Sequence, residues 1–528
     1  MNVKKLLKTP IKAIGLLLCF GASIPLMAAT LTIGRANEPQ SIDPLFSRTG
    51  NNQMTAIHIY DRLVLTDQNV RVQPGLAERW ENIDPTTWRI QLRKGVKWHD
   101  GRDFTAEDVL FSMERAPNVP NSPASFAGSV GSIESMTIID PHTIEMTSKK
   151  PDPLFINNIG TVYILPKHIA ETAVNADFNS GAAAIGTGPY QFVEWIPGDR
   201  LVLERNENYW GAKPAYEKVI MKFISNDAAR VAALLSGSVD LIDLVPPSDV
   251  QMLRDDSKFT VHQVPSVRLI YLALTQRDET PLFTDSAGQP LTKNPFQDTR
   301  VRQAVNLMID REAIVDRVLS GAGEPAGQTV PEGVFGFDRS MKPTKPDVVK
   351  ARELLAEAGY PNGFGLTLFG SNDRFSQDGE VTQALGQLLS RGGLKVNEVK
   401  TMPYSVYSKE AGKGSFPAFV FSYGNSTGEV SRGLLSMFHT YDKKGTGHGT
   451  LNRFRYSNPA LDALLVEAIQ DFNDSSRETK LQKAAAVAMQ EVAIVPLYFQ
   501  SVAWASRADI SFVARKDERT LAMGAAPK

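Results

Sequence analysis

The segment LRKGVKWHDGRDFTAEDV, residues 92–109, carries the densest structural signals in the chain. Just before it, the stretch from Trp88 to Leu92 alternates apolar and polar residues, which is the pattern of a half-buried β-strand. Near its end, Thr105 and Asp108 have the spacing of a capping box, in which each residue accepts a hydrogen bond from the backbone N–H of the other. The segment therefore predicts a strand, then a turn, then a helix that begins at Thr105.

Helices and strands alternate along much of the remaining chain. Residues 347–359 have the plan of a helix, with Asp347 as its N-cap and Gly359 at its carboxyl end. A second apolar helical face runs from Val301 to Met308. Strand candidates alternate with these helices, at residues 219–224, 269–274, 366–369 and 418–421. This alternation predicts an α/β fold.

The size and charge of the chain limit its function. With 528 residues, 42% of them apolar, the chain is too long for a single hydrophobic core, so we expect two or more packing units. Its 57 basic and 58 acidic residues nearly cancel. The protein therefore lacks the single-sign field that a nucleic-acid binder uses to engage phosphates, and we expect no nucleic-acid partner.

The amino terminus has the plan of a cleavable secretory signal peptide. Residues 1–29 combine four lysines, an apolar stretch and small residues at the end, with cleavage expected after Ala28 or Ala29. The only cysteine, Cys19, lies inside this segment, so the mature chain would have no disulfide and no thiolate nucleophile. A lipoprotein would acylate Cys19, but Leu18 precedes it and the apolar stretch would be cut short. The sequence predicts export to the periplasm.

Two extended stretches bear on the domain organisation. Val267 to Thr275 lies midway along the chain, and Ala493 to Ala505 lies near its carboxyl end. If both cross between lobes, the chain leaves the first lobe once and returns to it once. Two strands that cross side by side form a hinge, because a few residues can absorb the change in dihedral angles. The alternative is that both are ordinary core strands.

A series of motifs over almost the whole mature chain resembles the signature of extracellular solute-binding proteins, family 5. This family includes the oligopeptide, dipeptide and nickel receptors. The motifs are LAERW at 76–80, LRKGVKWHDG at 92–101, FTAEDV at 104–109, GTGPY at 186–190, NENYWG at 206–211, RVRQA at 300–304 and residues 351–363. Such an ordered series is far more specific than any one short motif.

The resemblance implies a bilobed fold that closes on its ligand. Lobe I would comprise residues 30–270 and 495–528, with an inserted subdomain near residues 75–180, and lobe II would comprise residues 271–494. The resemblance also implies that the signature is structural. We therefore expect core tryptophans and a turn, at Trp80, Trp88, Trp98 and His99–Asp100.

Receptors of the dipeptide type, which this chain resembles, use an arginine for the ligand carboxylate and an acidic residue for its ammonium. The arginine candidate is Arg374, in the loop after the strand 366–369. A guanidinium can hold a carboxylate through two parallel hydrogen bonds. The alternative is a solvated surface arginine.

The loop after the strand 418–421 supplies the other candidates. It has no aspartate, and Glu429 is its nearest acid, so the sequence departs here from the dipeptide pattern. Tyr423 could stack on the ligand and Asn425 could hydrogen-bond to it, or both could serve the structure of the loop.

The same loop offers an enzymatic alternative. Gly424 to Gly428 fits G-x-S-x-G, the nucleophile elbow of serine hydrolases, with Ser426 as the nucleophile. Asp442 and His448 follow in the order of a triad, but they lie in a glycine-rich stretch without a rigid support. We therefore expect no catalytic residues. No metal-binding motif appears, and His439 with His448 is the only near pair of histidines, so we expect neither a metal nor a cofactor.

Together these features predict the periplasmic substrate-binding component of an ABC import system, a monomer that binds a peptide or related zwitterion between its lobes. Its partners would be a membrane permease and the ATPase subunits of that permease. The alternative within the same family is a chemosensory or regulatory binding protein.

Overall fold

The computed structural model describes residues 30–278, 283–425, 427–442 and 448–528. The predicted signal peptide and Ser426 lie outside the described residues. Within the described ranges, no helix is both long enough and apolar enough to cross a membrane.

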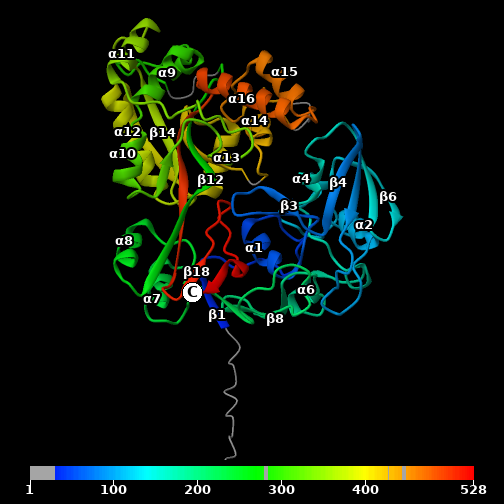
Figure 1. Cartoon of the computed structure of the whole chain (residues 1–528). Coiled ribbons are helices and arrows are strands. Elements are labelled where there is room, and N and C mark those ends of the chain that lie inside the picture. Colours follow the sequence, from blue (N-terminus) through cyan, green and yellow to red (C-terminus); the bar gives the residue numbers. More distant parts are fainter. Residues whose placement is uncertain (1–29, 279–282, 426, 443–447) are drawn as a thin grey trace, which may run out of the picture.

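One large mixed sheet extends through the molecule (Figure 1). Its strands pair in the order β15, β14, β16, β12, β17, β11, β1, β10, β9, β8, and β13 pairs β17 from the side. Their bounds are Lys395–Met402, Gly365–Ser371, Ala418–Gly424, Phe259–Leu274, Val495–Arg507, Leu241–Ile242, Thr30–Arg35, Lys218–Phe223, Arg200–Arg205 and Tyr190–Ile196 in that order, with β13 at Gly323–Pro325.

The strands β12 and β17 join the two ends of this sheet. They pair antiparallel from Phe259 opposite Arg507 to Leu272 opposite Val495, with irregular register between Pro265 and Leu269. Figure 1 shows them running together from the lower to the upper part of the molecule. The two stretches predicted to cross between lobes thus lie side by side as paired strands.

Buried apolar side chains form separate clusters on the two sides of this strand pair. Two clusters draw on residues 31–253 and 502–525, and we call this part lobe I. Two other clusters consist of residues between 267 and 499, together with Val70, and we call this part lobe II. The residue bounds expected for the lobes from the sequence stay a prediction.

The helices cover the sheet in both lobes. Those of lobe I are α1 (Gly50–Ile59), α2 (Ala106–Arg115), α3 (Ala127–Val130), α4 (Phe155–Ile159), α5 (Lys167–Ala170), α6 (Asn175–Ser180), α7 (Asp227–Leu235) and α8 (Pro247–Asp255). Those of lobe II are α9 (Thr299–Met308), α10 (Arg311–Ala313), α11 (Val348–Glu357), α12 (Asp378–Gly392), α13 (Tyr404–Lys413), α14 (Ser431–Phe438), α15 (Pro459–Ala468) and α16 (Asp474–Gln490). Two small two-stranded sheets pair β2 with β3 (Val64–Thr66, Val72–Pro74) and β18 with β19 (Ile510–Phe512, Ala525–Pro527).

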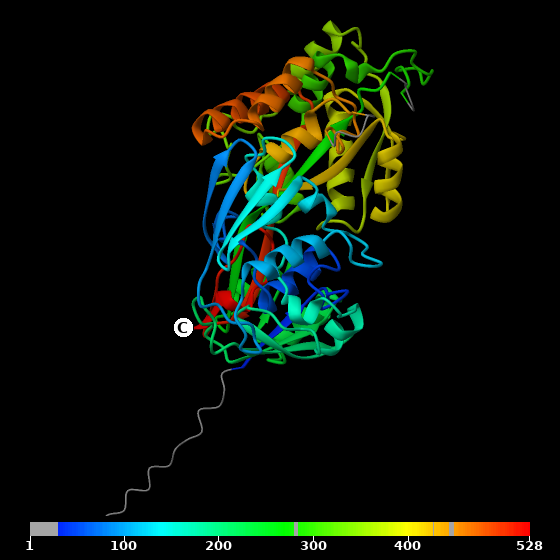
Figure 2. The ribbon, with the colours of Figure 1, turned by 90° about the vertical axis from the view of Figure 1, so that its right-hand side faces the viewer.

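The signature segment forms part of a separate four-stranded sheet in the order β4, β5, β7, β6 (Ala77–Asp84, Thr87–Leu92, Thr143–Ser148, Ile133–Asp140). In Figure 2 this sheet rises toward the helices of lobe II. The alternation predicted for Trp88, Ile90 and Leu92 is confirmed, since all three are buried and their neighbours are half-buried. Trp98 is buried in the same core, and Trp80 is half-buried against it.

The predicted start of α2 is confirmed. The Asp108 carboxylate accepts a hydrogen bond from the Thr105 N–H at 2.9 Å, which is one half of the predicted capping box. The same carboxylate accepts from the Lys167 N–H at 2.9 Å. Helix α11 likewise begins as predicted, because Asp347 accepts from the Lys350 N–H at 2.9 Å.

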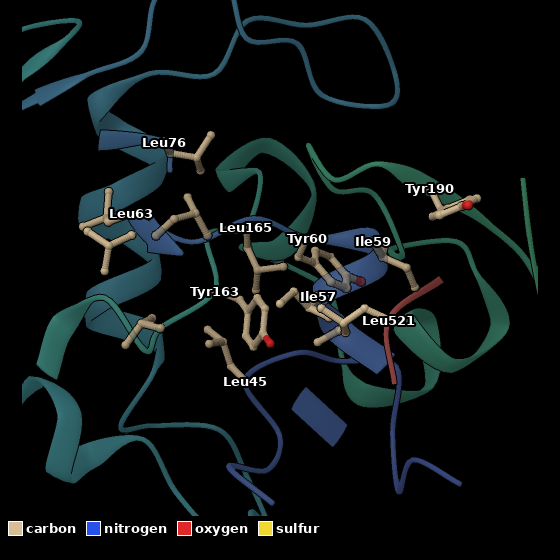
Figure 3. Close-up of a cluster of buried hydrophobic side chains, with 14 of the residues drawn as sticks. Leu45, Ile57, Ile59, Tyr60, Leu63, Leu76, Tyr163, Leu165, Tyr190 and Leu521 are labelled. Carbon is tan, nitrogen blue, oxygen red and sulfur yellow. The ribbon is translucent and has the colours of Figure 1, made fainter. Parts of the chain in front are cut away.

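His58 links α1 to the carboxyl-terminal segment in the core of lobe I. Its Nδ1 donates to the Met54 carbonyl at 2.9 Å, and its Nε2 accepts from the Ala522 N–H at 3.0 Å, which is the pattern of a neutral imidazole. Figure 3 shows Leu521 beside Ile57 and Ile59 of this helix. Burial and the charge of Arg35 lower the pKa of His58 to about 3.

Acidification is therefore expected to destabilise lobe I. The unfolded chain takes up a proton at His58 below about pH 6.5, whereas the folded chain does not until about pH 3. The contribution of His58 to the free energy of unfolding is fully present above the pKa of His58 in the unfolded chain. As the pH falls from about 6.5 to about 5, this contribution decreases by about 2 kcal/mol. Urea unfolding at the two pH values measures the loss, and His58→Gln should reduce it. Equal losses in both proteins would contradict the assignment.

Candidate functional site

Three strands of lobe II end at one edge of the sheet. β14 pairs parallel with both β15 and β16, so their carboxyl ends at Met402, Ser371 and Gly424 lie together. In open sheets of this kind, ligands bind outside the carboxyl ends of the parallel strands. The four predicted site residues lie at the end of β16 or in the loops that follow β14 and β16, so the fold brings them to the same edge.

The loop after β16 faces lobe I. The Asn157 amide of lobe I donates to the Thr427 carbonyl at 3.4 Å. At the tip of the β2–β3 hairpin, the Val70 carbonyl lies so close to Gly428 that any Cβ at this glycine would collide with it. Gly428 also has a φ of 73°, which favours glycine. The carboxyl edge of the parallel strands therefore lies at the boundary between the lobes.

Arg374 is exposed at this edge. Its guanidinium stacks over the Tyr404 ring, 4.8 Å from the ring centroid, and Tyr404 begins α13 directly after β15. The Arg374 backbone N–H donates to the Asp378 carboxylate at 3.0 Å. In the part of the chain that the structure describes, the guanidinium makes no ion pair. Its charge is held in place by the ring and is available to an anion.

Asn425 and Tyr423 serve the structure of the loop. Asn425 is buried, its amide donates to the Glu429 carbonyl at 2.9 Å, and its side-chain oxygen accepts from the Thr427 hydroxyl at 3.0 Å. Tyr423 is half-buried against the core of lobe II, and its ring lies against Gly433 at the start of α14. Burial raises the pKa of Tyr423. These contacts fix the shape of the edge on which Arg374 and Glu429 lie.

Glu429 is 4% exposed and forms an ion pair with Arg477, which no sequence pattern singles out. Its Oε2 accepts from Arg477 Nη2 at 3.2 Å, and its Oε1 has no hydrogen-bond partner among the described residues. Burial raises the pKa of Glu429, and the charge of Arg477 opposes this shift. Arg477 lies in the first turn of α16 and stacks over the Phe335 ring, 5.0 Å from its centroid.

A cavity of about 890 Å³ lies beside this pair. Lobe I contributes Arg71, Trp80 and Asn157 to its wall, and lobe II contributes Phe335, Glu429 and Arg477. This volume falls in the range of small-molecule sites, and the wall combines aromatic rings with charges of both signs. A guest in this cavity would contact both lobes at once.

The described part of the structure offers no support for the hydrolase alternative or for a metal site. Ser426 lies outside the described residues. The rings of His439 and His448 lie 4.6 Å apart, and His439 is 3.8 Å from the Asp462 carboxylate. Across the described ranges, no group of three histidine, cysteine, aspartate or glutamate side chains could hold a metal ion.

Comparisons with known proteins agree on one family. A family model described as "Bacterial extracellular solute-binding proteins, family 5 Middle" matches residues 71–445. The chain is 28% identical over 501 residues to the glutathione-binding protein GsiB of Escherichia coli strain K12, with 93% of each covered. HbpA2 from Haemophilus parasuis matches 94% of this chain and 100% of its own, with a TM-score of 0.82 and 24% identity.

A second solved structure is DppA from Helicobacter pylori in complex with the peptide STSA. It covers 94% of this chain and 98% of its own, with a TM-score of 0.73 and 24% identity. At this identity the likeness bears on the fold alone. The likeness to these solved structures confirms the predicted α/β, bilobed periplasmic-binding-protein fold.

Proposed function

This chain belongs to the bacterial extracellular solute-binding proteins, family 5, and we propose that it captures a peptide or a related zwitterion in the periplasm. It delivers this ligand to a membrane ABC permease, which is driven by its ATPase subunits. Members of the family bind solutes for transport and are not enzymes, so the hydrolase alternative is set aside. The observation that supports the proposal best is an exposed arginine, Arg374, which forms no ion pair with the described residues and lies at the carboxyl edge of the parallel strands.

In this proposal the ligand meets a charge at each end. Arg374 binds the carboxylate through two parallel hydrogen bonds, while Tyr404 keeps its guanidinium in place. Glu429 offers its unpartnered Oε1 to the ligand ammonium, because its other oxygen is occupied by Arg477. Tyr423 fixes the shape of this edge through its contact with Gly433, and Asn425 holds the loop that carries Glu429.

Closure follows from the arrangement of the strands. β12 and β17 are the long paired strands between the lobes, and their irregular register near Pro265 provides a place to bend. A ligand that contacts both lobes favours the closed form in proportion to its differential affinity for that form. The permease then recognises surfaces that align only on closure. The chain supplies binding and orientation, and the bonds of the ligand stay intact.

The chemistry of the edge favours a peptide with a free carboxylate. Among the similar proteins are one named for glutathione and one solved with the peptide STSA, and both of these solutes carry a carboxylate and an ammonium group. Glutathione is therefore the first solute to test.

The experiment is to purify the exported protein, denature it, and identify the released solute by mass spectrometry. We expect a peptide or peptide conjugate that rebinds in calorimetry and is recovered unaltered after incubation. A solute converted into products, or a released solute without a carboxylate, would rule out the proposed function.

A further inference from the structure

Each lobe packs one apolar side chain against the core of the other lobe. Val70, at the tip of the β2–β3 hairpin of lobe I, is 1% exposed and belongs to a core cluster of lobe II. In the opposite direction, Phe472 of lobe II packs against the core of lobe I, where its ring centroid lies 6.1 Å from that of Trp88. Removing these side chains from water favours the state in which the lobes are together.

The backbone of Val70 indicates that its side chain has a role. Its φ of 68° lies in the left-handed region, which is costly for a β-branched residue and which asparagine or glycine adopts more easily. The turn itself needs only the backbone, because the Val70 N–H donates to the Asp67 carbonyl at 3.1 Å. A strained conformation of this kind persists where contacts elsewhere compensate for it. For Val70 these contacts are with lobe II, so the strain is compensated only while the lobes are together.

The Val70 contact lies beside the strands that join the lobes. The Lys516 N–H donates to the Gln68 carbonyl near the hairpin tip, and the Lys516 carbonyl accepts from the Val267 N–H of β12, both at 2.9 Å. Lys516 also reaches lobe II, since its Nζ donates to the Glu332 carbonyl at 2.8 Å. The hairpin tip is thus held next to β12 and next to lobe II.

The Phe472 contact lies at another part of the boundary between the lobes. Trp88 belongs to the four-stranded sheet, which Figures 1 and 2 show on the side of the molecule away from β12. The cavity wall includes Arg71, which follows Val70 in sequence, and Asp474, which is two residues after Phe472. Val70, Trp88 and Phe472 lie outside the described wall of the cavity. A guest in the cavity would therefore be flanked by both contacts without touching the side chains that make them.

We propose that the contact of Val70 with lobe II and the contact of Phe472 with Trp88 form a latch, which keeps part of the unliganded protein closed and slows the release of a bound ligand. Both contacts are lost when the lobes separate, so they favour the closed form with or without a ligand. A ligand adds its own differential affinity to this bias. Val70 and Phe472 are positioning residues for binding, and the inference is the same for any solute that the protein carries.

Small-angle X-ray scattering of the proteins after removal of bound solute tests the latch directly. Phe472→Ala and Val70→Asn should each give a larger radius of gyration than the wild-type protein, because more molecules are open. Asparagine suits the left-handed turn, so the hairpin should still fold in Val70→Asn. Phe472→Leu keeps an apolar side chain and should stay close to the wild-type radius.

Val64→Ala is the matched control. Val64 lies in β2 of the same hairpin, and its side chain is buried in the core of lobe I. This change should lower the melting temperature without a change in the radius of gyration, because a loss of packing within one lobe does not alter closure.

The rate of ligand release tests the second part of the inference. With glutathione as the probe, Phe472→Ala and Val70→Asn should raise the dissociation rate in stopped-flow measurements by roughly 3- to 30-fold, since the lobes reopen more often. The association rate should not fall, because the open form admits the solute. Val64→Ala should leave the dissociation rate nearly unchanged.

The inference is overturned if either latch variant, Phe472→Ala or Val70→Asn, keeps the wild-type radius, or if Val64→Ala enlarges the radius as much as they do. A wild-type dissociation rate in both latch variants also contradicts it. If glutathione does not bind, the radii without solute decide alone. Larger radii in the two latch variants then support the latch, while the missing affinity counts only against glutathione as the ligand.

Discussion

Replacing Arg477 by alanine is expected to lower the free energy of unfolding by about 3–5 kcal/mol, because Glu429 would be left buried without a counterion. The two side chains are only 6% and 9% exposed, so solvent cannot take over the role of the guanidinium. Burial already raises the pKa of Glu429 against the pull of Arg477. Without this arginine the pKa should rise further, and the loss of stability should be smaller at low pH. Urea unfolding at two pH values measures both effects.

Lys483→Ala provides the matched control, since Lys483 is an exposed residue of the same helix. Its effect should stay within about 0.5 kcal/mol. The double variant Glu429→Gln, Arg477→Met should recover part of the loss, because it removes both charges together. If Arg477→Ala were as stable as the wild-type protein, the buried pair would have no structural role.

Replacing Arg374 by alanine is expected to weaken binding of the released solute by roughly 30- to 1,000-fold, which corresponds to about 2–4 kcal/mol. The exposed guanidinium packs only on the Tyr404 ring, and the bond from the backbone N–H to Asp378 does not need the side chain. The melting temperature of the unliganded protein should therefore stay nearly unchanged. Calorimetry measures the affinity, and thermal unfolding without ligand measures the stability.

Arg374→Lys separates charge from geometry. Lysine keeps the positive charge but cannot form two parallel hydrogen bonds to a carboxylate, so we expect an intermediate affinity. An unchanged affinity in Arg374→Ala would show that the carboxylate binds elsewhere.

Local patterns predicted the signature segment well. The alternation around Ile90 and the capping pair Thr105 and Asp108 each depend on residues a few positions apart, and both appear in the structure. The bond from the Lys167 N–H to Asp108 could not be predicted, because it joins residues 59 positions apart. Local spacing thus located the elements but not the contacts between them.

The candidate site was predicted in part for a different reason. Arg374 and Glu429 each follow a buried strand, and parallel pairing of β14 with β16 places both loops at one edge. No local pattern indicated the role of Arg477. It lies 48 positions from Glu429, in the polar first turn of α16, and such a polar turn is typical of an exposed helix. Asn425 follows a strand as Glu429 does, and only its hydrogen bonds show that it is committed to the loop.

The packing of Val70 in the core of lobe II is the clearest contact that no sequence pattern predicts. Val70 lies at the tip of the β2–β3 hairpin among residues of lobe I, with a φ of 68°. Its side chain is 1% exposed and belongs to a core cluster of lobe II. Only the packing of the two lobes can reveal this, because its neighbours in sequence are polar.

Small-angle X-ray scattering of the wild-type protein, recorded with and without its released solute, tests the central claim most directly. Binding between two hinged lobes predicts a smaller radius of gyration in the presence of the solute, together with loss of this change in Arg374→Ala. Identical scattering profiles at saturating solute would contradict the account.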